Sequence, residues 1–175
     1  MLLVDKYPFL LEPTLPVLVI RMAMVFICGG AIGYKRDVAG YAAGLRTHIL
    51  VCMGAMLAMA TGQFAFVEFG SAVEPTRIGA QVVSGIGFLG AGTILVNRKR
   101  QHIVGLTTAA GLWASACIGL AIGIGFYEGA IVGTVAVYFT EQTLRRLHKK
   151  RRSESQIWNG IDDDGEGTDD DPATK

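Results

Sequence analysis

The chain has 175 residues, of which 51% are hydrophobic and only 18% are charged, and its mean hydropathy is +0.41. These values exclude an ordinary soluble domain and favour a membrane protein. The formal net charge of +1 hides a basic run, Arg145 to Arg152, and an acidic run, Asp162 to Asp171, so the sum says little about partners.

Five apolar stretches along the chain are predicted to form membrane helices, because about 20 apolar residues cross the roughly 30 Å of hydrocarbon. The first four are residues 15–33, 49–67, 78–96 and 103–127. The last apolar stretch continues beyond Glu128 and is too long for one helix, so we expect a turn near residues 123–129 and a fifth span that ends at residue 144. The fifth has an uncharged core of only 12 residues, a length that also suits a re-entrant segment.

The cationic residues predict the orientation of these spans. Twelve of the 16 Lys and Arg residues lie in the connections between spans one and two, between spans three and four, and after span five. By the positive-inside rule these connections face the cytoplasm. The sequence therefore predicts an all-α integral membrane protein of about five helices, with its N-terminus outside and its C-terminus inside.

The third span contains Gly85-Ile86-Gly87-Phe88-Leu89-Gly90, which matches the G-x-G-x-x-G pattern of dinucleotide-binding turns. That turn needs a preceding strand and an acid about 20 residues later, yet no Asp or Glu occurs between Glu74 and Glu128. We interpret the glycines as close-packing residues, or as a point where the third span unwinds to expose carbonyls. The glycines predicted to pack helices are Gly85, Gly87, Gly90, Gly92, Gly119 and Gly123.

A weak internal repeat links the two halves of the apolar region. Residues 44–47 and 105–108 share the pattern G-L-x-T, and each copy opens a span that runs outward. Gly29 and Gly90 are separated by the same 61 residues. Spans one and two therefore either repeat as spans three and four in parallel orientation, or match by chance in a glycine-rich sequence.

Polar residues near the spans are the candidates for function, because an ionisable group in a bilayer is costly and usually faces protein or water. Arg21 lies inside the first span and is expected either to extend toward the outer surface or to pair with Glu128 or Glu68. Glu74 and Arg77 mark either a helix cap or a polar entrance from outside. The full set is Arg21, Arg36, Asp37, Arg46, Thr47, His48, Glu74, Arg77, Gln81, Thr107 and Thr108.

Nothing in the pattern predicts a catalytic residue, a bound metal or a cofactor, because no nucleophile and base or ligand cluster occurs at workable spacing. The three cysteines, Cys28, Cys52 and Cys117, lie in apolar stretches and are interpreted as packed thiols. The chain divides into an external segment (1–14) without the basic region of a cleaved signal peptide, a transmembrane domain (15–144), a basic segment (145–152) and an acidic tail (153–175) expected to be disordered.

Three phrases together resemble the MgtC/SapB family of bacterial inner-membrane proteins: "AGLRTHILV" (43–51), "EPTRIGAQVVSGIGFLGAGTIL" (74–95) and "GLTTAAGLWASACIGLAIG" (105–123). The resemblance covers roughly residues 21–140. The family pattern has an arginine–acid pair where Arg36 and Asp37 stand, and Asp where Glu74 stands. Many relatives carry an ACT-like domain after the last span, whereas this chain has a short acidic tail, which puts any role of that domain in doubt.

The resemblance implies a polytopic membrane protein linked to growth under magnesium limitation and, in pathogens, to survival inside macrophages. Some members are thought to restrain the F-type ATP synthase or to alter membrane potential. We therefore expect a non-enzymatic regulator whose partners are the lipid bilayer, a membrane ATPase or other membrane protein and a second copy of itself, but not nucleic acid. The alternative is a magnesium or proton transporter whose path is lined by the third span with Arg21, Glu74, Arg77 and Gln81.

Overall fold

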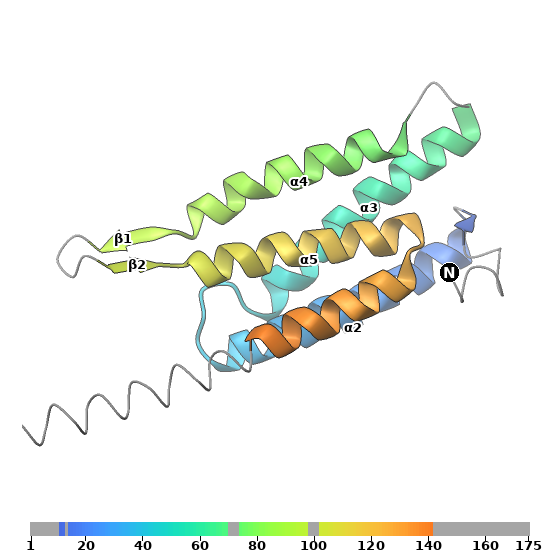
Figure 1. The fold of residues 1–175 in the computed structure, drawn as a ribbon. Coiled ribbons are helices and arrows are strands. Elements are labelled where there is room, and N and C mark those ends of the chain that lie inside the picture. The colour runs from blue at the N-terminus through green and yellow to red at the C-terminus, as the bar shows by residue number, and fades with distance from the viewer. Residues whose placement is uncertain (1–10, 13, 70–73, 98–101, 142–175) are drawn as a thin grey trace, which may run out of the picture. The chain divides into compact units, whose positions relative to one another are not determined.

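The computed structural model describes residues 11–12, 14–69, 74–97 and 102–141 of the chain. The chain divides into two compact units, Met1–Tyr138 and Phe139–Lys175, and the packing described below is that of the first. Its elements follow in the order α2 (Leu15–Val38), α3 (Leu45–Phe69), α4 (Pro75–Gly92), β1 (Leu95–Asn97), β2 (His102–Val104) and α5 (Leu106–Ile124) (Figure 1). Residues 127–141 are also helical, of which 127–138 belong to the first unit.

Helix α3 is the central element of this unit, since α2, α4 and α5 all pack against it. Gly29 and Gly33 of α2 place their backbone against α3, at Ile49 and Leu45 respectively, which makes the two helices antiparallel. Gly119 and Gly123 of α5 contact α3 at Cys52 and Met56, so α5 runs parallel to α3. Small residues thus bring three helices into backbone contact, the usual route to tight packing where lipid supplies no hydrophobic driving force between helices.

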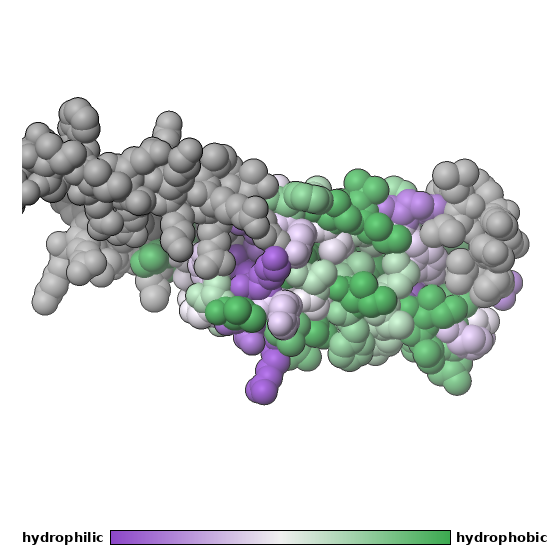
Figure 2. Space-filling view, turned by 90° about the horizontal axis from the view of Figure 1, so that it is seen from below, coloured by the Kyte–Doolittle hydropathy of each residue, from purple (hydrophilic) through white to green (hydrophobic). Residues whose placement is uncertain are grey.

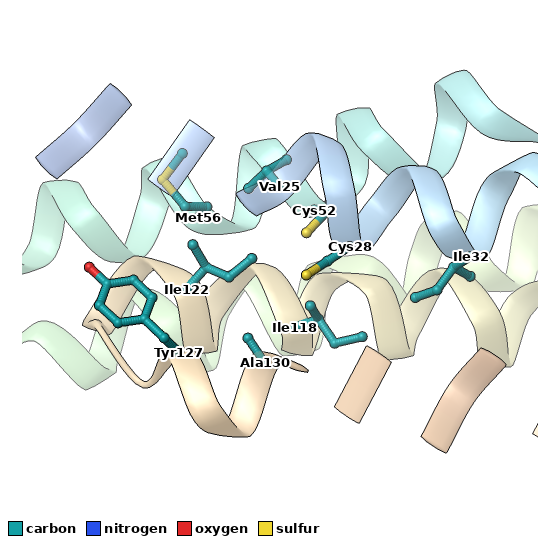
Figure 3. Packing of buried hydrophobic residues seen from close by; sticks show 9 residues of the cluster. All are labelled: Val25, Cys28, Ile32, Cys52, Met56, Ile118, Ile122, Tyr127 and Ala130. Carbon is teal, nitrogen blue, oxygen red and sulfur yellow. The ribbon is translucent and has the colours of Figure 1, made fainter. Parts of the chain in front are cut away.

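The apolar core lies where α2, α3 and α5 meet the helix that begins at residue 127. Figure 3 shows side chains from these four elements pointing into one cluster. Ile32, Met56 and Ile122 are completely enclosed, and the thiols of Cys28 and Cys52 are buried in the cluster as free cysteines. The cluster consists of Val25, Cys28, Ile32, Cys52, Met56, Ile118, Ile122, Tyr127 and Ala130.

The prediction of an all-α membrane protein is confirmed, with the addition of one short hairpin. Within the described residues, α2, α3 and α5 are long and apolar enough to cross a bilayer. Large hydrophobic side chains remain exposed on the surface of these helices. The face of the molecule drawn in Figure 2 is mostly hydrophobic in its middle, with hydrophilic residues toward its two ends. The count of five spans and their orientation stay predictions.

The boundaries predicted for the third and fourth spans were wrong. Helix α4 ends at Gly92, so residues 93–96 of the predicted third span are not helical. Leu95 and Val96 belong to β1 of an antiparallel hairpin, in which Val96 pairs with Ile103. Helix α5 begins only at Leu106, because Gly105 has φ +98°, a left-handed conformation that ends the preceding strand. The apolar, β-branched residues of the hairpin resemble span residues in composition, so hydropathy alone assigns them to helices.

The predicted turn and the predicted repeat both correspond to features of the fold. Gly125, with φ +92°, ends α5 and lies inside the range 123–129 where a turn was expected. The two G-L-x-T phrases open equivalent helices, α3 at Leu45 and α5 at Leu106, which are 61 residues apart and parallel. The interpretation of spans one and two as a parallel repeat of three and four therefore agrees with the arrangement of α2–α3 and α4–α5.

We predict that Gly119→Ala destabilises the protein by about 1–3 kcal/mol, the range typical of overpacked interiors. The added methyl group would overlap with the carbonyl oxygen of Cys52 and lie 2.9 Å from the Cβ of Ala55. Thermal unfolding of the detergent-purified protein measures the change. The matched control is Gly54→Ala, because a methyl group at Gly54 meets nothing within 4 Å. Equal melting temperatures for the two variants would contradict the backbone contact.

Candidate functional site

Two clusters of buried polar side chains lie in the contact between α2, α3 and α5. Each is organised by an arginine of α2: Arg21 is 1% exposed and Arg36 is 3% exposed. We call them the Arg21 cluster (Arg21, Gln63, Gly123 and Tyr127) and the Arg36 cluster (Arg36, Ala43, His48, Thr108 and Ser115).

The Arg21 cluster connects α2 to three other parts of the chain. The Arg21 guanidinium donates from Nη1 to the Gln63 side-chain oxygen of α3 at 2.9 Å and to the Gly123 carbonyl of α5 at 2.8 Å. Its Nε donates to the Tyr127 hydroxyl at 3.2 Å. Gln63 in turn donates to the carbonyl of Leu11 at 2.8 Å. Arg21 is therefore a buried structural link, and the expectation that it extends toward the outer surface was wrong.

The Arg36 cluster joins the other end of α2 to the start of α5. Nη2 of Arg36 donates to the Thr108 hydroxyl at 2.7 Å, across 72 residues of sequence, and Nε donates to the Ala43 carbonyl at 3.3 Å. The guanidinium also lies over the ring of Tyr41, 4.5 Å from its centroid. Such charge-assisted contacts fix both the loop after α2 and the entry of α5.

His48 is, together with Ser115, one of the two fully buried polar residues of the Arg36 cluster. It is fully buried in α3, beneath Gly33 of α2, whose missing side chain leaves room for it. Its Nδ1 lies 2.8 Å from the Ser115 hydroxyl of α5, and its Nε2 is buried without a hydrogen-bond partner. The imidazole therefore connects α3 to α5 through Nδ1, while Nε2 makes no hydrogen bond.

One stripe of α5 supplies partners to both clusters. Thr108, Ser115, Gly119 and Gly123 follow one another at spacings of seven, four and four residues, which places them on one face of a helix. The first two carry hydroxyls, and the last two bring the backbone of α5 close to α3. The apolar core, including Ile118, Ile122 and Met56, lies between the two clusters and separates them.

Most of the other predicted polar candidates lie on the surface of the described structure. Asp37, Arg46, Glu74, Arg77, Gln81 and Thr107 are exposed, and Thr47 is half-buried. The structure brings Arg36, His48 and Thr108 into one cluster but leaves Glu74, Arg77 and Gln81 on α4. The Asp37 side chain lies against Gly44, and no ion pair joins Asp37 to Arg46 among the described residues.

The six predicted packing glycines differ in their surroundings. Gly119 and Gly123 contact the backbone of α3, and a methyl group at Gly90 would lie 3.5 Å from the Cβ of Ala109. In contrast, a methyl group at Gly85, Gly87 or Gly92 meets nothing within 4 Å. These three glycines lie on an open side of α4, where no described residue of the same chain packs.

Three residues of the clusters were not among the sequence candidates: Gln63, Ser115 and Tyr127. A signal for Ser115 exists in its seven-residue spacing from Thr108, and Gln63 is the one amide within the second predicted span. Tyr127 carries no such signal, because its contact with Arg21 depends on the turn at Gly125. In the part of the chain that the structure describes, no group of three or more His, Cys, Asp or Glu residues is placed to hold a metal ion.

Comparison with known proteins gives several extended similarities. The sequence profile of the MgtC family matches residues 22–150. The chain is 43% identical over 151 residues to the Escherichia coli K12 protein named "Putative magnesium transporter YhiD", a match that covers 81% of this chain and 69% of that protein. It is 43% identical over 130 residues to "Protein MgtC" of Brucella abortus strain 2308, covering 72% of this chain and 50% of that protein. No solved structure matches the chain.

We predict that Thr108→Val lowers the free energy of unfolding by about 1–3 kcal/mol, since it removes a buried hydroxyl that accepts from Arg36 while keeping the size of the side chain. The matched control is Thr107→Val on the neighbouring, exposed position. Chemical or thermal unfolding of the purified protein gives both values. A Thr107→Val loss as large as that of Thr108→Val would show that the cluster does not carry the effect.

Proposed function

The chain belongs to the MgtC family, and on this premise we propose that it is a multi-pass inner-membrane protein that supports growth in low magnesium as a regulator, not as a conduit for the ion. The proposal assigns no catalytic role to any residue. Its coarser part, a membrane protein linked to magnesium, follows from the family and from the names of the relatives. Its finer part, regulation, is supported by the way the core is filled.

The closed contact between α2, α3 and α5 is the observation that carries this proposal. An ion that passed there would have to cross the apolar core and separate backbones that already touch at Gly119 and Gly123. Mg²⁺ prefers oxygen ligands and gives up its water reluctantly. In the two clusters, the oxygens of Gln63, Gly123 and Thr108 already accept hydrogen bonds from guanidiniums, which supply no ligand themselves.

We propose that the regulated partner is a membrane ATPase such as the F-type ATP synthase, as the family resemblance implies. The exposed hydrophobic side chains of α2 and α3, among them Val19, Phe26 and Leu50, give a surface suited to lipid or to a helix of another membrane protein. The buried clusters would then hold this surface in a fixed shape. Loss of either cluster should impair regulation without opening a path for ions.

The second candidate is a magnesium transporter, which is favoured by the name of the Escherichia coli relative. Its path would have to run beside α4, because Gln81 and the open glycines lie on that helix. This candidate needs a further wall, supplied by another chain, to enclose the path. It therefore makes a different prediction for the isolated protein in a bilayer.

Reconstitution into liposomes loaded with a magnesium-sensitive dye separates the two candidates. We predict that Mg²⁺ entry stays at the rate of empty liposomes, while the same protein restores growth in low magnesium to a host that lacks its own family member. Arg36→Gln should reduce this rescue even when expression is raised until the protein level matches that of the parent, because it removes the positive charge at the centre of the Arg36 cluster. A magnesium flux that depends on the amount of protein would overturn the regulator and favour the transporter.

A further inference from the structure

None of the residues that the structure describes covers one side of α4. Arg77, Gln81, Ser84, Phe88 and Ala91 are all exposed, and Phe88 reaches 88% exposure. Their spacings of four, three, four and three residues place them along one face. Gly85, Gly87 and Gly92 flank this face and have open space around them. We call these residues the α4 face.

The α4 face differs from the surfaces that α2 and α3 expose. Those surfaces carry large hydrophobic residues such as Val19, Ile27 and Leu57, which suit lipid tails. The α4 face instead carries a cation, an amide and a hydroxyl, and α4 is not among the described helices that are apolar enough to cross a bilayer on their own. Polar groups on a membrane helix are costly toward lipid and favourable toward another helix.

The charged and polar groups of the α4 face are complementary to those of the same face on a second copy of the chain. Two copies inserted in one bilayer have the same orientation, so a two-fold axis along the membrane normal sets their α4 helices parallel. Glu74 and Arg77 are both exposed and lie at the same end of each helix, so each carboxylate can meet the guanidinium of the other copy. The Gln81 amide both donates and accepts, so two such amides can pair across the axis.

Phe88 adds a complementary shape to this charge pattern. The ring projects from the helix between Gly85 and Gly92, which lie three residues before it and four residues after it and leave space on either side. In a parallel pair, the ring of one copy can fill the space beside a glycine of the other. We propose that the α4 face binds the same face of a second copy of this chain, in parallel, through the Glu74–Arg77 pairs, Gln81 and Phe88.

Cysteine cross-linking in native membranes tests this assignment, which rests on the fold and not on the proposed function. With Ser84→Cys and a short bismaleimide, we expect a covalent dimer well above the level of the parent chain with its native cysteines. Leu57→Cys, exposed on α3, is the matched position on a lipid-facing surface. No dimer above that of Leu57→Cys, or a product with a different protein or with the chain's own tail, would overturn the proposal.

Two further sets of variants separate association from folding. A Cβ at Gly85, or at Gly54 on α3, meets nothing within 4 Å in the same chain. Of Gly85→Leu and Gly54→Leu, only Gly85→Leu should lower the yield of the Ser84→Cys dimer, by about tenfold. Glu74→Arg and Arg77→Glu should each lower the yield, and the double variant should restore it. Failure of the double variant to restore the yield, with both single variants in the membrane, would exclude the charge pairs. Magnesium flux or its absence leaves these outcomes unchanged.

Discussion

The close approach of α3 to α2 and α5 is the constraint on which the other contacts of the first unit depend. At Gly33 and Gly119 the neighbouring backbones leave no room for a side chain. This closeness is what lets Arg21 and Arg36 of α2 reach acceptors on α5, and what lets His48 reach Ser115. With wider helix spacing, these polar groups would lose their hydrogen-bond partners, and their burial would be unfavourable.

The two arginine clusters show how a membrane protein can bury charged side chains by surrounding them with acceptors from several helices. Each guanidinium donates hydrogen bonds to segments that are far apart in sequence, and it thereby holds these segments together. Hydrogen bonds to a charged donor are stronger than neutral ones, particularly where water is excluded. The apolar core, with Cys52 and Ile122 among its members, lies between the two clusters and keeps them apart.

The sequence predicted much of the fold because composition and glycine spacing act locally. Hydropathy located α2, α3 and α5, and the G-L-x-T repeat located the starts of α3 and α5. It misplaced the ends around residues 94–105, because Val96 and Ile103 are as apolar in a hairpin as in a span. For the site, charge within a span pointed to Arg21, but its partners Gln63 and Tyr127 depend on how three helices meet, which no local pattern records. The open surroundings of Gly85 and Gly87 could not be predicted either, because the sequence does not distinguish a glycine that packs against a neighbouring helix from one that does not.

The helix that follows α5 breaks the approximate repeat formed by the pairs α2–α3 and α4–α5. Helices α2–α3 and α4–α5 form two equivalent halves, and α3 and α5 lie side by side at their centre. Residues 127–138 run along α2, from Tyr127 at Arg21 to Tyr138, whose ring lies 5.4 Å from Nζ of Lys35. The equivalent place beside α4 holds no helix within the described part of the chain. Within the described residues, the helix that begins at residue 127 therefore covers one half of the repeated unit, at α2, and leaves α4 of the other half exposed.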